Sequence, residues 1–98
     1  MSKVGEVITV MTANGEYVGK VKNLEGGVLT LSDPRMIVMS DDGMGFANGI
    51  AMTGIQEPKE VTFESYTFFT ETDQAVVNAW NEHTGQIVVP NKGGIVGA

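Results

Sequence analysis

The fold of this chain is decided by residues 14–27, which read NGEYVGKVKNLEGG. Asn14-Gly15 is a strong hairpin signal, because both residues accept the positive φ of a type I′ turn. Apolar and polar residues then alternate over 16–24, as along a half-buried strand, and Gly26-Gly27 predicts the next turn. Gly19 lies inside this strand, where a glycine marks a bend or the close approach of another backbone. We expect a bend, because short bent strands can close into a small barrel.

Two further strands are expected on either side of this segment. Residues 4–12 are rich in β-branched side chains, and residues 28–39 form a mostly apolar run. Pro34 lies within the second run and lacks an amide N–H, so it predicts a bulge, an edge or a break. Further along the chain, we expect a loop over 40–49 and strands over 50–55 and 60–71.

The period of the pattern changes after residue 71. Apolar and aromatic positions then recur at steps of three and four, which predicts one face of a helix. This face contains Val76, Ala79, Trp80 and His83. Thr70 or Thr72 is expected to cap the start of the helix, and Gly85 its end. We expect Trp80 to be a packing anchor and His83 to suit the negative end of the helix dipole.

Length and composition indicate one domain. The chain has 98 residues, of which 1–71 are expected to form a β-barrel and 72–98 a helix and tail packed on it. A short strand over 86–90 and a loose tail over 91–98 are expected after the helix. There is no cysteine, no signal-peptide pattern and no apolar stretch of about 20 residues, so a cytoplasmic protein without a membrane span is expected.

The charge balance disfavours one class of function. Six basic residues stand against twelve acidic ones, giving a net charge of −6. Nonspecific coating of nucleic acid requires phosphate neutralisation, which such a chain supplies poorly. Lys20 and Lys22 could form a small phosphate track, although a solvated strand face is the interpretation that we favour.

No catalytic or metal-binding constellation is recognisable. His83 is the only histidine, and no cysteine or suitably spaced acidic residue accompanies it. Asp41-Asp42-Gly43 lacks the further ligands of a calcium loop, so an exposed acidic loop is expected there. We therefore expect a non-catalytic protein without a metal or cofactor.

The pattern of strands and glycines resembles the Sm-like family, in particular the divergent Sm-like proteins of phages and marine metagenomes. The resemblance covers about residues 4–68. Residues that match the first family motif are Ile8, Val10, Gly15, Gly19, Val21, Leu31 and Asp33. Met52-Thr53-Gly54 is the nearest equivalent of the second motif. The resemblance implies a mostly β fold, a small five-stranded and strongly bent antiparallel barrel with one C-terminal α-helix.

Assembly and RNA binding are also implied by the resemblance. Sm-like subunits form rings of about five to seven copies by pairing their fourth and fifth strands. The residues implied at this interface are Ile50, Met52, Phe63, Tyr66 and Phe68. The residues implied in binding single-stranded RNA are Asn23, Gly26, Gly27, Thr53, Gly54, Gln56 and Lys59. The implied setting is RNA metabolism or regulation in the cytoplasm of a bacterial or phage-infected cell.

An alternative remains open at this point. Glu25 and Gly27 occupy positions where the family has aspartate and a base-binding asparagine, and Thr53 replaces an arginine. These differences, together with the acidic charge, favour a structural or protein-interaction ring without nucleic-acid binding. Its partner would be the same chain, with a further unknown protein.

Overall fold

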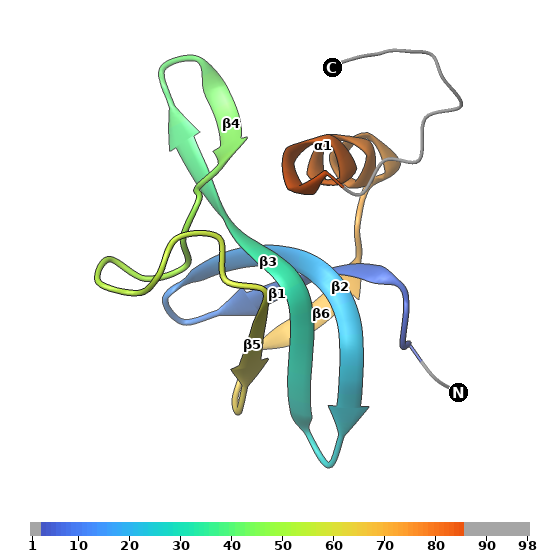
Figure 1. Ribbon diagram of the computed structural model, residues 1–98. Coiled ribbons are helices and arrows are strands. Elements are labelled where there is room, and N and C mark those ends of the chain that lie inside the picture. The colour runs from blue at the N-terminus through green and yellow to red at the C-terminus, as the bar shows by residue number, and fades with distance from the viewer. Residues whose placement is uncertain (1–2, 86–98) are drawn as a thin grey trace.

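The computed structural model describes residues 3–85 (Figure 1). The strand expected over 86–90 and the tail over 91–98 lie outside the described residues. The elements are β1 (Val7–Thr12), β2 (Gly15–Glu25), β3 (Val28–Ser40), β4 (Gly43–Phe46), β5 (Glu60–Phe63), β6 (Phe68–Glu71) and α1 (Gln74–Thr84).

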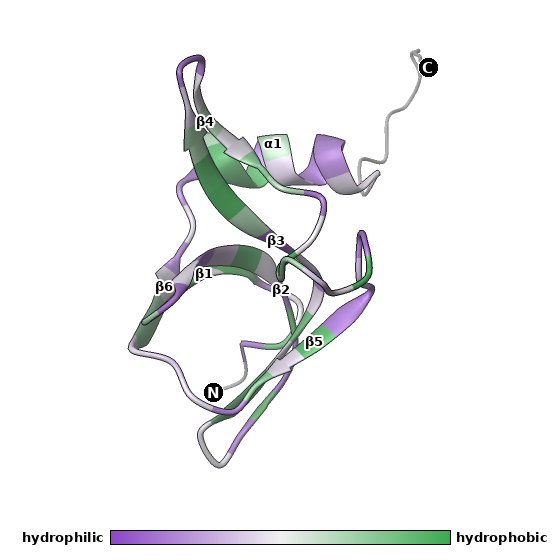
Figure 2. Ribbon diagram, turned by 90° about the vertical axis from the view of Figure 1, so that its left-hand side faces the viewer, coloured by the Kyte–Doolittle hydropathy of each residue, from purple (hydrophilic) through white to green (hydrophobic). Residues whose placement is uncertain are grey.

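The strands form one antiparallel sheet, as expected of a mostly β chain with a C-terminal helix. Its order is β4-β3-β2-β1-β6, and β5 pairs with the first part of β3. Figure 2 shows the strands curling around a common interior. Only residues 64–67 connect β5 to β6, which pair with opposite sides of the β1–β2–β3 meander. The architecture is consistent with a small barrel-like fold.

The expected assignments over 40–55 are wrong at two places. Residues 50–55 form bends and turns in which local bonds, such as Gly54 N–H to Ala51 O at 3.3 Å, replace a strand partner. The expected loop over 40–49 instead contains β4, which pairs with the end of β3 across a turn at Asp41-Asp42. Gly43 follows this turn as the first residue of β4 and has a φ of 110°, which favours glycine.

The single strand expected over 60–71 is divided into β5 and β6. β5 pairs with β3, and β6 pairs with β1. A straight strand could not follow both partners, so the chain leaves the ladder over residues 64–67. The sheet therefore has six strands rather than the expected five.

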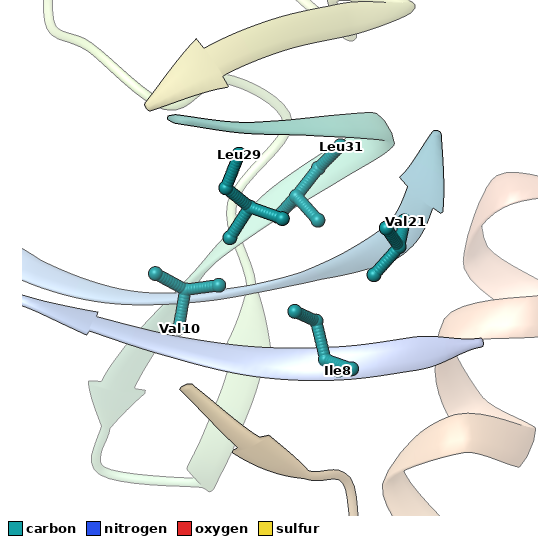
Figure 3. Packing of buried hydrophobic residues seen from close by; sticks show 5 residues of the cluster. All are labelled: Ile8, Val10, Val21, Leu29 and Leu31. Atoms are coloured by element: carbon teal, nitrogen blue, oxygen red, sulfur yellow. The ribbon is translucent and has the colours of Figure 1, made fainter. Parts of the chain in front are cut away.

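The core lies inside the curled sheet. Figure 3 shows the five buried side chains of its central cluster, Ile8, Val10, Val21, Leu29 and Leu31, which are at most 1% exposed. They come from alternate positions of β1 and β3 and from β2, because side chains two apart on a strand share a face. The partly buried Leu24, Phe63, Tyr66 and Phe69 surround them. Burial of this set closes the sheet around its own interior.

The structure explains the glycine in the middle of β2. On either side of Gly19, Lys20 pairs with Ser32 and Val18 pairs with Arg35. Pro34 therefore lies in a β-bulge of β3, which is one of the three alternatives predicted for it. A Cβ on Gly19 would lie 3.2 Å from the Pro34 Cα and 3.1 Å from the Leu31 Cβ. Gly19 does not have a positive φ. The glycine is therefore needed for the close approach of β3.

The helix is attached to this same bulge. Trp80 is fully buried, as expected of an anchor, and its Nε1–H donates to the carbonyl oxygen of Asp33 at 2.9 Å. Asp33 has a φ of 49°, so the indole bonds to the residue whose backbone makes the bulge. α1 is thus fixed over the point where β3 leaves regular pairing with β2.

The two ends of α1 differ in how well they were predicted. Its N-cap is Asp73, whose carboxylate accepts from the Ala75 N–H at 3.2 Å. Thr72 does not cap the helix as expected, because its hydroxyl bonds the Thr9 hydroxyl at 2.9 Å, and Thr70 belongs to β6. Gly85 is the predicted C-cap, with a φ of 74°.

Candidate functional site

The first group of residues expected to bind RNA lies at the β2–β3 turn. Gly26 and Gly27 have φ values of 59° and 82°, and a Cβ at either would meet no atom within 4 Å. Asn23 pairs with Thr30 in the ladder just before the turn and is exposed. This turn therefore offers backbone to solvent with little side-chain cover.

The second group lies elsewhere. Thr53, Gly54, Gln56 and Lys59 are exposed in the irregular segment that leads into β5. The Asp33 N–H donates to the Lys59 carbonyl oxygen at 2.8 Å, which places Lys59 beside the middle of β3. The β2–β3 turn is at the start of β3, roughly 16 Å away at about 3.3 Å per residue. The structure does not bring the two groups together.

The course of β5 explains this separation. β5 runs antiparallel to β3, from Glu60 opposite Ser32 to Phe63 opposite Leu29. The chain therefore approaches the β2–β3 turn only at the end of β5, where residues 64–67 begin. The sequence predicted a strand over 50–55 before β5, so residues 53–59 were expected near the β2–β3 turn. In the structure, residues 64–67 lie nearer to that turn.

The basic residues near these segments are few and partly matched. Lys22 forms an exposed ion pair with Glu60 across the β2, β3 and β5 ladder. Lys59 is flanked in sequence by acidic residues, since Glu57 lies two positions before it and Glu60 directly after it. An exposed ion pair contributes little stability, but it does reduce the charge available to a phosphate. The expected track of Lys20 and Lys22 is therefore weaker than the sequence indicates.

β5 and β6 are edge strands, as is β4, which pairs only with β3 among the described strands. Within residues 3–85, β5 pairs only with β3 and β6 pairs only with β1. The bond from Asp33 N–H to Lys59 O sets the alternation along β5. By this alternation, the amides of Glu60 and Thr62 point away from β3. β5 thus presents donors along its outer edge.

The residues expected at a subunit interface divide into two sets. The first set is Ile50, Met52 and Phe68. Met52 is fully exposed, Phe68 at the start of β6 is 50% exposed, and Ile50 is half-buried, so a partner subunit could contact them. The second set is Phe63 and Tyr66, which pack against the core of their own chain.

A groove that sequence reasoning missed separates the β3–β4 hairpin from α1. The groove is open to solvent and has a volume of about 570 Å³. Ile37 and Phe46 lie on the hairpin side, and Val76 and Ala79 on the helix side. Met44 and Phe46 are spaced two residues apart, as on one face of a strand, but residues 40–49 were expected to form a loop.

His83 lines this groove next to Phe46. Its ring lies 5.3 Å from the Phe46 ring, centroid to centroid. Burial lowers the pKa of His83 below its ordinary 6.5, and the positive charge of the buried Arg35 lowers it further, while Glu57 opposes both effects. The neutral imidazole is therefore favoured, rather than the cation that the helix dipole alone would favour.

Stability should consequently depend on this histidine in mildly acidic solution. The unfolded chain binds a proton on His83 more readily than the folded protein does, so stability falls as the pH drops through about 6.5 towards the lower folded-state pKa. Urea unfolding at pH about 7.5 and about 5.5 measures the loss. The loss should be smaller in His83→Gln. An equal loss in both proteins would show that His83 does not cause it.

The described residues contain no cluster of three or more histidine, aspartate or glutamate side chains placed to hold a metal. Within the same part of the chain, α1 is the sole helix, and it is too short to cross a membrane.

The fold and its edges define a small, mostly β protein with one antiparallel sheet and one helix. No protein-family model matches the chain, and no curated protein matches it.

Proposed function

We propose that this protein is a non-catalytic, homo-oligomeric ring that acts as a structural or protein-interaction scaffold. The observation that supports it is the pair of short edge strands, β5 and β6, at separate edges of the curled sheet. Each has a partner on one side only within the described residues. Pairing β5 of one subunit with β6 of the next would use both edges in one repeating contact. Head-to-tail contacts of this kind close into rings when the rotation fits.

The physical argument rests on unpaired backbone. A free strand edge attracts other strands, and soluble proteins cover, shorten or pair such edges. β5 and β6 are short, which reduces their tendency to pair with strands of other molecules. The half-exposed Phe68 nevertheless offers an apolar contact at the start of β6. Ordered pairing between subunits would bury both the amides and this ring. The Sm-like resemblance implies ring assembly by pairing of the strands expected over 50–55 and 60–71. Because residues 50–55 do not form a strand, the pairing proposed here uses β5 and β6 instead.

One substitution tests the proposed pairing directly. Thr62→Pro removes an amide that points away from β3, so it should spare the ladder within the subunit and prevent pairing with the next subunit. We expect the wild-type protein to be a discrete oligomer at micromolar concentration and Thr62→Pro to be smaller. Light scattering coupled to size exclusion measures both masses.

The matched control is Thr62→Ala. It removes the hydroxyl bond between Thr62 and Thr30, which is 3.0 Å long, but keeps the amide. It should assemble like the wild type. A monomeric wild-type protein, or equal assembly of Thr62→Pro and wild type, would refute pairing through β5.

Single-stranded RNA binding is a second candidate, favoured by the exposed turn at Gly26 and Gly27. Backbone amides without side-chain cover can approach phosphates closely, and a ring would repeat the turn around its axis. The net charge of −6 limits the number of phosphates that can be neutralised. We therefore propose weak binding, in the micromolar range, as the form that this activity would take.

Salt dependence distinguishes this candidate from the scaffold alone. Fluorescence anisotropy with labelled oligo-U and oligo-A should show affinity falling with salt, with a log–log slope of roughly −1 to −3. Lys59→Ala should make the slope shallower if a bound strand reaches both groups of residues. Asn23→Ala should weaken binding with little change in slope, because its side chain is neutral. If neither oligonucleotide binds in low salt at roughly tens of micromolar protein, RNA binding is excluded.

A further inference from the structure

An open pocket lies where the connection from β5 to β6 (Figure 2) passes the β1–β2 turn. Thr12 and Asn14 line it from this turn, and residues 62–67 line it from the end of β5 onward. The Thr67 N–H donates to the Met11 carbonyl oxygen at 2.8 Å, which holds the connection beside the end of β1. The pocket has a volume of about 570 Å³ and shares no lining residue with the groove beside α1.

Three aromatic rings gather at this pocket. They belong to Tyr17 of β2, Phe63 of β5 and Tyr66 of the connection after β5. The Tyr17 and Phe63 rings lie 5.2 Å apart, centroid to centroid, and are inclined by 59°, so they form adjacent walls rather than a parallel stack. Phe63 and Tyr66 are half-buried, which leaves part of each side chain uncovered. The faces of such rings are negative and attract cations.

The described residues that line the pocket carry one charge, and it is negative. Glu64 supplies this charge from an exposed position. Tyr17 is only 7% exposed, yet it lines the pocket, and its hydroxyl makes no hydrogen bond with a described residue. The chain as a whole has a net charge of −6. A phosphate or carboxylate ligand would therefore be repelled from the pocket, whereas a cation would be attracted to it.

We propose that this pocket binds a quaternary ammonium group, with Glu64 as its counter-ion and the three aromatic rings as its walls. A primary ammonium group needs acceptors for three N–H donors. A quaternary group has no N–H donor and contacts aromatic rings through its methyl groups, a known mode of recognition. Three rings and a single carboxylate match the quaternary group. The proposal does not depend on assembly of subunits or on RNA binding.

Choline and 3,3-dimethylbutan-1-ol test the role of the positive charge. The two molecules have the same shape, but a carbon atom replaces the charged nitrogen in the second. A titration of the full chain, followed by nuclear magnetic resonance, should give choline an affinity on the order of tenfold higher, because only choline is attracted to the rings as a cation. Equal affinities of the two molecules, or no binding of choline at roughly tens of millimolar, would overturn the proposal.

Glu64→Gln tests the counter-ion, because it keeps the shape of the side chain and removes the charge. Glu64 is exposed, so the substitution should leave the fold intact and weaken choline binding severalfold, while binding of the neutral molecule stays unchanged. The matched control is Glu82→Gln, which makes the same change in the groove beside α1 and should leave choline binding unchanged. Equal weakening by the two substitutions would contradict binding at this pocket.

Substitutions of Tyr66 test the aromatic walls. Tyr66→Leu keeps an apolar side chain against the core but removes the ring, so most of the preference for choline over the neutral molecule should be lost. Tyr66→Phe keeps the ring and should keep the preference. An unchanged preference in a folded Tyr66→Leu protein would overturn the role of this ring. If Tyr66→Leu fails to fold, Glu64→Gln still decides the proposal, since Glu64 is exposed.

The quaternary group can come from a small molecule or from a trimethylated lysine side chain of a protein. Choline is therefore compared with a short peptide that contains one trimethyllysine and with the same peptide carrying unmodified lysine. Either choline or the trimethylated peptide should shift the resonances of Tyr17, Phe63 and Tyr66, and the one that binds more tightly identifies the source. If neither shifts these resonances, or if unmodified lysine binds as tightly as trimethyllysine, the proposal fails.

Discussion

Trp80→Ala should lower the free energy of unfolding by about 3–5 kcal/mol, the largest effect that we expect from a single change. The side chain is fully buried and connects α1 to the bulge of β3. Its removal leaves a cavity and also leaves the Asp33 carbonyl oxygen without the indole donor. Urea unfolding followed by circular dichroism measures the change.

Two further variants separate the contributions. Trp80→Phe keeps most of the apolar contact but removes the donor, so it should cost less than alanine, with about 1 kcal/mol due to the lost bond. Glu82→Ala changes an exposed residue of the same helix and should stay within about 0.5 kcal/mol of wild type. A Trp80→Ala protein as stable as Glu82→Ala would show that α1 is not anchored at the bulge.

Gly19→Val should destabilise the protein by on the order of 1–3 kcal/mol, because there is no room for its side chain. Even a Cβ would lie 3.2 Å from the Pro34 Cα, which is backbone and cannot rotate away. The Leu31 Cβ is as close on the same side. Gly19→Ala should therefore also be destabilising, though less so than valine, in the same unfolding measurement.

Gly45→Ala is the matched control for this crowding. Gly45 is also in a strand, has no positive φ, and a Cβ there would meet no atom within 4 Å. Alanine at Gly45 should be close to neutral. If alanine at Gly19 is equally neutral, β3 does not approach β2 as closely as the structure indicates.

Local signals in the sequence were sufficient for much of the fold. Gly26-Gly27 predicts the turn that joins β2 and β3, because turn geometry depends on the residues within the turn. The helical period after residue 71 and Gly85 predict α1 and its end, for the same reason. A turn between β1 and β2 was also predicted, but its type was wrong: it consists of Ala13 and Asn14, and neither Asn14 nor Gly15 has a positive φ. The buried position of Trp80 also follows from its place on the apolar face.

The sites were less predictable, because they depend on partners distant in sequence. Residues 50–55 and 43–46 are both short and apolar, yet only the second can continue a hairpin from β3 and become a strand. β5 and β6 separate because they pair with different strands, and this determines which segment lies near the β2–β3 turn. Strand pairing is a long-range choice that periodicity within a segment does not encode.

The sequence by itself therefore determined the class of structure, the central hairpins and the helix, while the tertiary structure decided the edges and the groove. Gly19 shows the difference most clearly. Its position in a strand predicts a bend or a close approach, and the close approach is seen only when the bulge at Pro34 on the opposing strand is known. The physical reason is that space around a residue is set by the strand that packs against it, which no local pattern describes.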